Sequence, residues 1–402
     1  SCSSGQEKKL PQEPISCDIL ISNGTIYDGS GSKPYVGSLA IKDDKIIYVG
    51  ENTDFQADTV IDATDLAVSP GFINMLSWGY NSLMDDGRAL SDLKQGVTLE
   101  IFGEGTSPGP YWKDGKFTSF GEAMTMLEKK GVSVNIGSFL GAATTRILEV
   151  GYNNRQATPS EMERMRGHVE NSMKEGAMGI GSSLIYAPGD YASTEELTEL
   201  SKVASEYGGM YISHLRSEGT NLLEALEELI SISRNANIPA EVYHLKASRE
   251  PNWSKLDDVI KRIEEVRKEG LKITADIYTY NASSTGLTGV IPTWVQEGGH
   301  RAWINRMKDP EVRPRLLADI REQLDEQPPE GILLVGFKTS KMSRKYLAKT
   351  VAEAAAMRGQ TPEEAIVDMV IEDDHRIQCI YFSMSEDNLS LIHISEPTRP
   401  RI

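Results

Sequence analysis

Two of the six histidines follow apolar segments in the same way, His214 in YISHLRSEG and His244 in EVYHLKASRE. Imidazole is the commonest side-chain ligand of protein-bound metals. A neutral imidazole at equivalent points of two neighbouring strands would make half of a zinc site. A lone buried histidine is more often a hydrogen-bonded core residue than a ligand, but two histidines at equivalent positions favour a metal site.

From residue 70 onward, apolar segments alternate with amphipathic helices, which predicts a parallel sheet. The helical spacing of Leu256, Val259, Ile263 and Val266 is an example. Seven successive units favour a TIM-like (β/α)8 barrel over an open sheet, with the eighth strand missing here. Because reactive groups lie at the carboxyl ends of barrel strands, both histidines are expected at the barrel mouth. The seven predicted strands are GFINML, VTLEIFG, SVNIGSFLG, AMGIGSSLIY, GMYISHL, AEVYHLK and KITADIYTY.

The barrel, predicted over residues 70–388, is flanked by a region of different character. Residues 18–69 hold short alternating strands with Asn-Gly and Asp-Gly turns, which predicts a small β domain. Within the barrel, residues from about 290 to 376 indicate a helical insertion with three helices. The segment CIYFSMSEDN (379–388) is expected to lead back toward the missing eighth unit.

The chain has 402 residues, of which 42 are basic and 59 acidic, giving a net charge of −17. This charge repels polyanions and argues against a nucleic acid partner. Apolar runs stay shorter than the roughly 18 residues that cross a bilayer.

Three cysteines are too few for a disulfide framework. The start SCSSGQEKK resembles a bacterial lipoprotein after signal-peptide cleavage, with the lipid on Cys2 and residues 1–17 as a tether. This predicts an exported protein, periplasmic or anchored to the membrane through Cys2 alone. The alternative is an arbitrary fragment start with an irrelevant cysteine.

Residues 389–399 read LSLIHISEPTR, the in-frame translation of a widely used transposase sequencing adaptor. We therefore expect residues 389–402 to be adaptor read-through and the native sequence to be truncated after Asn388.

From residue 18 to about 388 the chain resembles the D-aminoacylase (N-acyl-D-amino-acid deacylase) branch of the amidohydrolase superfamily. The resemblance is carried by DILISNGTIYDGSG, SPGFIN, DLKQGVTLEIFGEG, GAMGIGSSLIYAPGDYASTEEL, YISHLRSEG, EVYHLKAS and DIYTYNASSTGL, in matching order and spacing. It implies a zinc-bearing barrel flanked by a small β-sandwich, of which residues 18–69 would form the N-terminal part.

The resemblance assigns metal ligands unevenly. His214 and His244 match the two histidine ligands of strands five and six. Glu104 in GEG is the nearest group that could replace the family's cysteine ligand, although it could equally cap a loop. The paired histidines of strand one are replaced by Leu76 and Trp78, which would remove a second metal position. One Zn²⁺ per chain is therefore expected, held by Glu104, His214 and His244.

The resemblance also suggests substrate-binding residues. Lys246 matches a lysine that holds the substrate carboxylate, and Tyr280 and Ser284 lie where tyrosine and serine partners are expected. Tyr186 is a candidate for polarising the scissile carbonyl, or else a packing aromatic. The family's general base, an aspartate ending strand eight, is expected beyond Asn388, and Asp276 is expected to have a structural role.

The resulting hypothesis is a zinc-dependent hydrolase of amide C–N bonds, acting on N-acyl amino acids, those of the D series or related small amides. Cyclic-amide opening or deamination would share the metal. The alternative is a non-catalytic, ligand-binding barrel of an exported lipoprotein, which the loss of the strand-one histidines favours. Because the chain lacks strand eight, we expect it to be inactive as it stands.

Overall fold

The computed structural model describes residues 15–30, 32–51 and 54–395, so Cys2 and the start of the predicted tether lie outside the described residues. The chain divides into two compact units, residues 1–72 and 73–402. Because β1 begins at Ile15 and buries Cys17, residues 15–17 belong to a sheet and not to a tether.

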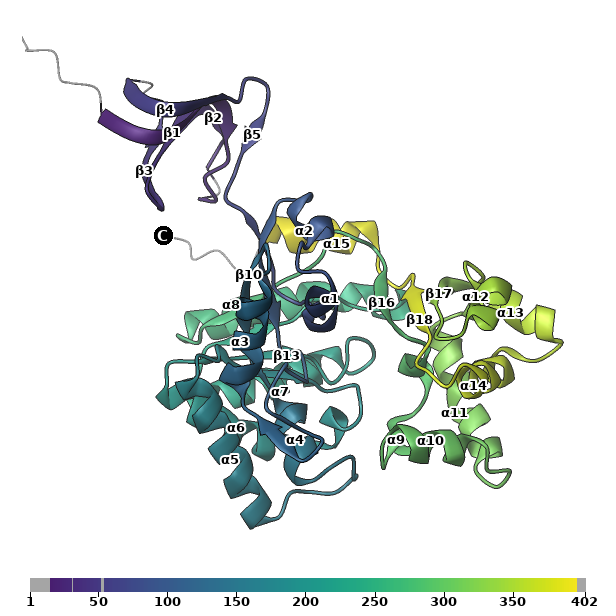
Figure 1. Cartoon of the computed structure of the whole chain (residues 1–402). Coiled ribbons are helices and arrows are strands. Elements are labelled where there is room, and N and C mark those ends of the chain that lie inside the picture. Colours follow the sequence, from purple (N-terminus) through teal and green to yellow (C-terminus); the bar gives the residue numbers. More distant parts are fainter. Residues whose placement is uncertain (1–14, 31, 52–53, 396–402) are drawn as a thin grey trace, which may run out of the picture. The chain divides into compact units, whose positions relative to one another are not determined.

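The first unit is a five-stranded sheet in the order β3-β2-β1-β4, with β5 beside β1 (Figure 1). Strand β1 is antiparallel to β2 and parallel to β4. The second layer that a β-sandwich requires is absent from the described part of this unit, so the sandwich stays a prediction. The strands are β1 (Ile15–Ile26), β2 (Tyr35–Lys42), β3 (Lys45–Gly50), β4 (Phe55–Asp62) and β5 (Ala67–Val68).

The second unit contains all seven strands predicted for the barrel. Strands β11 to β15 are mutually parallel and pair in chain order. Strands β6, β7 and β10 pair in a second sheet, and β10 and β11 are pieces of one strand separated at Phe139. The predicted α/β barrel fold is therefore confirmed as far as β15. The strands are β6 (Phe72–Asn74), β7 (Val97–Phe102), β10 (Asn135–Ser138), β11 (Leu140–Gly141), β12 (Gly179–Ser183), β13 (Met210–His214), β14 (Ala240–Val242) and β15 (Ile273–Ala275).

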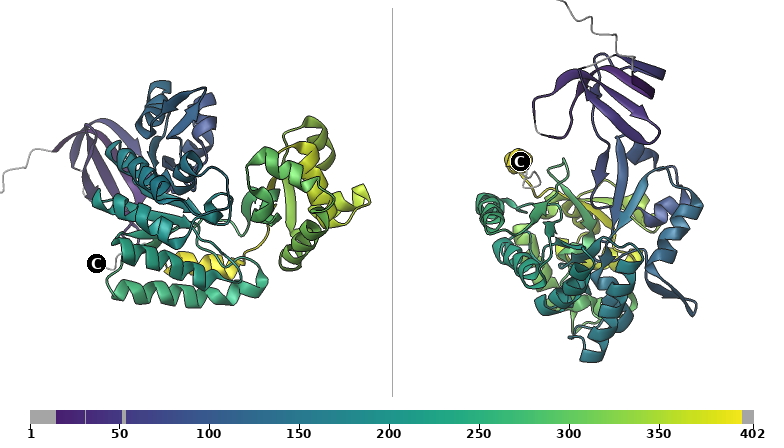
Figure 2. Two further views of the ribbon diagram at one scale, coloured as in Figure 1. Left: turned by 90° about the horizontal axis from the view of Figure 1, so that it is seen from below. Right: turned by 90° about the vertical axis from the view of Figure 1, so that its left-hand side faces the viewer.

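Helices connect these strands and cover the sheet. In α8, Leu256, Val259, Ile263 and Val266 are fully buried against the strands, as their spacing predicted. The teal helices of this region lie side by side (Figure 2). The connecting elements are α1 (Tyr80–Asp85), α2 (Leu90–Leu93), β8 (Tyr111–Lys113), β9 (Lys116–Thr118), α3 (Phe120–Lys130), α4 (Ala142–Glu149), α5 (Pro159–Lys174), α6 (Thr194–Glu206), α7 (Leu222–Ala236) and α8 (Leu256–Lys268).

The predicted insertion carries helices, but more than three, and also a sheet. Strand β18 pairs antiparallel with both β16 and β17, and this subdomain has its own apolar core. The segment 379–388 therefore first completes this sheet and then returns to the barrel in α15 (Glu386–Ser395), where Ile392 packs into the barrel core. The elements are β16 (Ser283–Gly286), α9 (Thr293–Gln296), α10 (His300–Met307), α11 (Arg313–Glu326), β17 (Ile332–Gly336), α12 (Ser340–Tyr346), α13 (Val351–Arg358), α14 (Pro362–Asp373) and β18 (Gln378–Tyr381).

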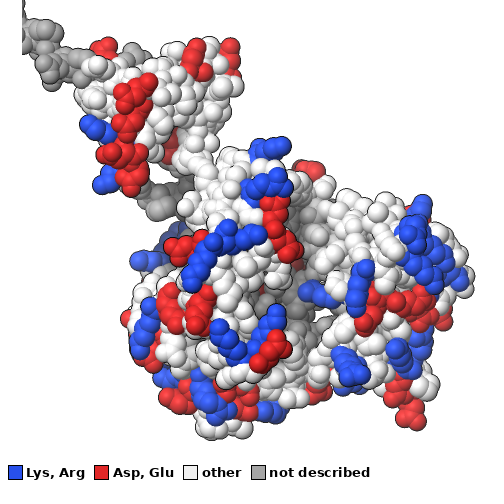
Figure 3. All heavy atoms as spheres, viewed as in Figure 1, with Lys and Arg blue, Asp and Glu red and all other residues white. Residues whose placement is uncertain are grey.

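Acidic and basic side chains both lie on the face drawn in Figure 3, in separate small groups of each sign. Among the described residues, no helix has the length and apolar character that spanning a bilayer requires.

Candidate metal centre

Three predicted ligands come together at the carboxyl ends of the barrel strands. His214 is the last residue of β13, and His244 follows β14 by two residues. Glu104 follows β7 between Gly103 and Gly105, whose φ angles of +108° and +69° strongly favour glycine. A Cβ atom on Gly103 would lie 2.3 Å from the carbonyl oxygen of Phe139. The GEG motif thus turns the chain so that the glutamate faces the histidines.

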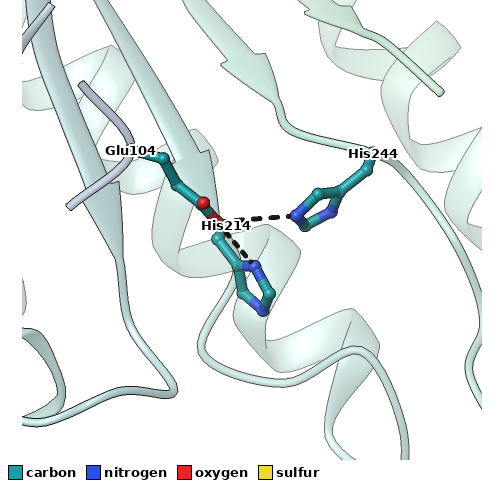
Figure 4. A group of neighbouring side chains, drawn as sticks. All are labelled: Glu104, His214 and His244. Atoms are coloured by element: carbon teal, nitrogen blue, oxygen red, sulfur yellow. Dashed lines mark hydrogen bonds and ion pairs between the residues drawn. The ribbon is translucent and has the colours of Figure 1, made fainter. Parts of the chain in front are cut away.

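Glu104 lies between the two imidazoles (Figure 4). Its Oε1 is 3.0 Å from His214 Nδ1 and 3.6 Å from His244 Nε2. The two rings meet edge to face, with centroids 4.5 Å apart. All three residues are buried, and none of them is more than 9% exposed. One ligand atom from each residue lies within 4.8 Å of the other two.

This donor set fits zinc. Tetrahedral zinc with ligands at about 2.0–2.1 Å requires donor atoms about 3.3 Å apart. The distances from Glu104 Oε1 to the two histidine nitrogens lie on either side of that value. One carboxylate and two imidazoles also leave a fourth position for water, as in catalytic zinc sites.

The metal-free electrostatics favour a cation at this point. Burial alone would raise the pKa of Glu104, but hydrogen bonds and charges from both histidines hold it far below its ordinary value. Burial lowers the pKa of His214. For His244, burial and the Lys246 charge oppose protonation, yet Glu218 and Glu104 outweigh them and raise the pKa to about 9. The ionised glutamate therefore attracts positive charge between the rings.

Trp78 and Leu76, which stand where the resemblance expected histidines, behave differently. The indole Nε1 of Trp78 donates a hydrogen bond of 2.8 Å to Glu104 Oε2. This leaves Oε1 facing the histidines. Leu76 packs against an apolar cluster that includes Phe139 and Tyr243. Only Leu76 is thus a simple apolar replacement.

Glu218 belongs to the centre and was missed in the sequence. Its Oε1 lies 3.0 Å from His244 Nδ1, 3.7 Å from His214 Nε2 and 2.5 Å from Lys246 Nζ. Burial opposes its charge, but Lys246 and the two histidines hold its pKa well below the ordinary value. Its position four residues after His214, in YISHLRSEG, was the available signal.

Asp276 contacts the backbone of His244. The backbone of His244 has φ = +36°, which is strained for a residue with a Cβ atom. Its N–H donates a hydrogen bond of 2.8 Å to Asp276 Oδ1. This contact is consistent with a structural role for Asp276.

Of the predicted substrate-binding and carbonyl-polarising residues, Tyr186 and Lys246 lie beside the two histidines. The ring of Tyr186 is 5.4 Å from that of His214, and its hydroxyl is 2.8 Å from Thr285 Oγ1. Burial raises the pKa of Tyr186 well above its ordinary value, so the hydroxyl keeps its proton. Lys246 lies beside His244, with Nζ 2.7 Å from Nδ1.

Tyr280 and Ser284 are not brought to the cluster by any contact among the described residues. Tyr280 is 63% exposed, whereas the ring of Tyr278 lies 6.3 Å from that of His244. Ser284 is exposed and donates to the carbonyl of Cys379, while its neighbour Thr285 faces Tyr186. Tyr278 therefore lies beside His244, and Thr285 beside Tyr186. The chain leaves the barrel after β15, and the alternation of a strand no longer determines which side chains face the centre.

A (β/α) barrel that gathers two histidines and a carboxylate at its strand ends is the arrangement of metal-dependent amidohydrolases. No family model matches the chain. It is 30% identical over 285 residues to a D-aminoacylase of Alcaligenes xylosoxydans xylosoxydans, covering 67% of this chain and 59% of that protein. An N-acyl-D-glutamate deacylase of the same organism is 27% identical over 284 residues, covering 67% and 58%.

A solved D-aminoacylase structure has a TM-score of 0.75 at 25% identity, covering 95% of this chain and 74% of that one. The N-acyl-D-glutamate deacylase of Bordetella bronchiseptica, solved with zinc and a phosphonate inhibitor, shares the fold with a TM-score of 0.75 at 23% identity, covering 94% and 74%. The chain belongs to the D-aminoacylase branch of the amidohydrolase superfamily. Its matched part spans less than two thirds of the length of the two curated relatives.

Proposed function

We propose that this protein is a zinc-dependent amidohydrolase that cleaves the amide bond of N-acyl amino acids, with the D series as the leading substrates. The observation that carries the proposal is the cluster of Glu104, His214 and His244 at the barrel mouth. The relatives support the substrate class, since they are named for the deacylation of N-acyl-D-amino acids.

We assign a separate role to each residue of the site. Glu104, His214 and His244 would hold one zinc ion. A bound zinc supplies an activated water and polarises the scissile carbonyl. Tyr186, whose hydroxyl keeps its proton, can donate to the oxyanion that develops on the carbonyl oxygen. Lys246 and Tyr278 provide a cation and an aromatic ring beside His244.

The proton shuttle is proposed to lie outside the described cluster. Hydrolysis requires a base that takes a proton from water and returns it to the leaving amine. We propose an aspartate encoded in the source gene beyond codon 388. Asp276 does not take this role in the proposal, because one of its oxygens already holds the amide of His244.

The proposed location is outside the cytoplasm, with a lipid on Cys2 as the anchor. Its support is the SCSSGQEKK start alone. Metabolic labelling of the source organism with a radiolabelled fatty acid tests it. Label on the wild type and its loss in Cys2→Ala are expected, and label retained in Cys2→Ala would contradict it.

The test of the function combines sequence and activity. The source gene is sequenced past codon 388, and its product is assayed on N-acetyl-D- and N-acetyl-L-amino acids with and without zinc. We expect an encoded aspartate and zinc-dependent release of the D-amino acid. A product that binds zinc and N-acyl amino acids without turnover would favour the ligand-binding alternative. Turnover of cyclic amides alone would retain the metal chemistry and replace the substrate class.

A further inference from the structure

Glu218 lies on the outer side of both histidines, away from Glu104. One oxygen, Oε1, faces His244 Nδ1 at 3.0 Å and His214 Nε2 at 3.7 Å. Its side chain is 16% exposed, and its carbonyl oxygen accepts a 2.7 Å hydrogen bond from the Ser248 amide. The backbone of Glu218 is therefore fixed, and its carboxylate lies next to the two rings. His214 Nε2 is buried and has no hydrogen-bond partner in the described structure.

We propose that Glu218 is a positioning residue that sets the tautomers of both histidines for metal binding. The inference rests on the proposed zinc centre. A neutral imidazole that gives one ring nitrogen to a metal carries its proton on the other, and an acceptor at that nitrogen fixes both the tautomer and the ring orientation. With Glu104 on the inner nitrogens, both outer nitrogens face the single oxygen of Glu218.

Lys246 balances the charge of Glu218. Its ammonium group contacts Glu218 Oε1 at 2.5 Å, His244 Nδ1 at 2.7 Å and the carbonyl oxygen of His244 at 2.9 Å. These three acceptors match the three hydrogens of an ammonium group, and the side chain is only 2% exposed. The Glu218–Lys246 pair is therefore a fixed, buried unit beside His244.

The contacts of His244 Nδ1 with Lys246 and with Glu218 exclude one another. His244 Nδ1 can accept a hydrogen bond from Lys246 only without a proton, and it can donate to Glu218 only with one. A ring that gives Nε2 to a metal pairs with Glu218, and Lys246 keeps Glu218 and the carbonyl oxygen of His244.

The experiment measures zinc affinity by competition with a chelator and ring protonation by long-range ¹H–¹⁵N NMR of the histidine side chains. We expect Glu218→Gln to bind zinc about 10–100-fold more weakly. The zinc-loaded wild type should carry the His244 proton on Nδ1. The charge-matched double variant Glu218→Gln/Lys246→Met, which leaves no unpaired buried charge, should stay equally weak. Glu227→Gln, which removes a carboxylate paired with Arg262 on the surface, is the control and should bind normally.

Three results would overturn the role of Glu218: wild-type affinity in Glu218→Gln, recovery of wild-type affinity in the double variant, or a zinc-loaded His244 protonated on Nε2. Recovery would mean that Glu218 only neutralises Lys246. If the wild type binds zinc no better than His244→Ala, the proposed zinc centre itself fails. Normal wild-type binding with an unaffected Glu218→Gln would instead overturn the inference alone.

Discussion

The inner and outer sides of the two imidazoles each carry a glutamate, yet they differ in what neutralises it. On the outer side, Glu218 Oε1 already has the ammonium group of Lys246 at 2.5 Å. On the inner side, Glu104 receives only the neutral N–H of Trp78 on one oxygen and faces the rings with the other. An added cation therefore gains most on the inner side, where a carboxylate charge has no permanent cation. The difference indicates where the metal binds, a point that ligand types alone leave open.

The largest expected effect is loss of the metal in His244→Ala. This variant removes one of three ligands, so we expect it to lose its stoichiometric zinc on dialysis. Elemental analysis of the dialysed protein measures the loss. His300→Ala is the matched control, because the His300 side chain is 49% exposed and its ion pair is with Asp374, far along the chain from the barrel strands. Stoichiometric zinc in His244→Ala would contradict the assignment of this ligand.

Glu104→Gln tests whether the metal binds on the inner side of the two imidazoles or on the outer side. Because Glu104 is expected to touch the metal and Glu218 only its ligands, Glu104→Gln should weaken zinc binding beyond the about 10–100-fold loss expected for Glu218→Gln. Chelator competition on the two variants in parallel measures the difference. Stronger binding in Glu104→Gln than in Glu218→Gln would place the metal on the outer side.

Lys246→Met tests the permanent cation of the outer side. Removing one partner of a buried ion pair costs about 3–5 kcal/mol, because the other charge stays buried. We expect a loss of this order in the free energy of unfolding of the metal-free protein, and recovery of most of it when Glu218→Gln is added. Lys202→Met, which breaks a surface pair with Glu199, should cost about 1 kcal/mol or less. A double variant no more stable than Lys246→Met would argue against the pair.

Glu241 differs from both Glu104 and Glu218, because the charged group beside it is another carboxylate, that of Asp276. Burial, only partly opposed by the hydrogen bond from Thr274, and the charge of Asp276 raise the pKa of Glu241 to about 7. Since a raised carboxyl pKa favours the folded state only while the group is protonated, its stabilisation holds below about pH 4.5 and is lost as the pH rises through 7. Glu241→Gln should be more stable than the wild type at pH 8 and equally stable near pH 4.5, as measured by the free energy of unfolding in denaturant. Parallel pH profiles would contradict the raised pKa.

The smallest expected effect is that of Trp78→Phe. The variant removes one hydrogen bond to Glu104 Oε2, worth about 1–2 kcal/mol, so zinc affinity should fall about 5–30-fold. Trp112→Phe, in the exposed β8–β9 hairpin, should leave it unchanged. If both variants bind zinc alike, Trp78 does not hold Glu104.

The barrel was predictable from sequence because its signals are local. Apolar runs flanked by amphipathic helices located all seven strands. Parallel strands end at one edge, and His214 and His244 therefore meet there without any knowledge of distant contacts. The placement of Glu104 depended on the GEG motif and on the resemblance.

The remaining site residues depend on contacts that no local pattern specifies. Glu218 lies in a loop, where side-chain direction has no period, and the Trp78 indole is recognised as polar only through its bond to Glu104. Tyr278 contacts His244 and Thr285 contacts Tyr186, and these contacts could not be predicted because the strand alternation ends at Ala275. The sheet of the insertion was missed because one of its strands, Ser283–Gly286, is short and polar.

The most direct test of the account is a crystal structure of the zinc-loaded protein with an anomalous difference map at the zinc absorption edge. We expect one peak per chain, about 2.0–2.2 Å from Glu104 Oε1, His214 Nδ1 and His244 Nε2. A peak beside Glu218, or none at the barrel mouth, would contradict it.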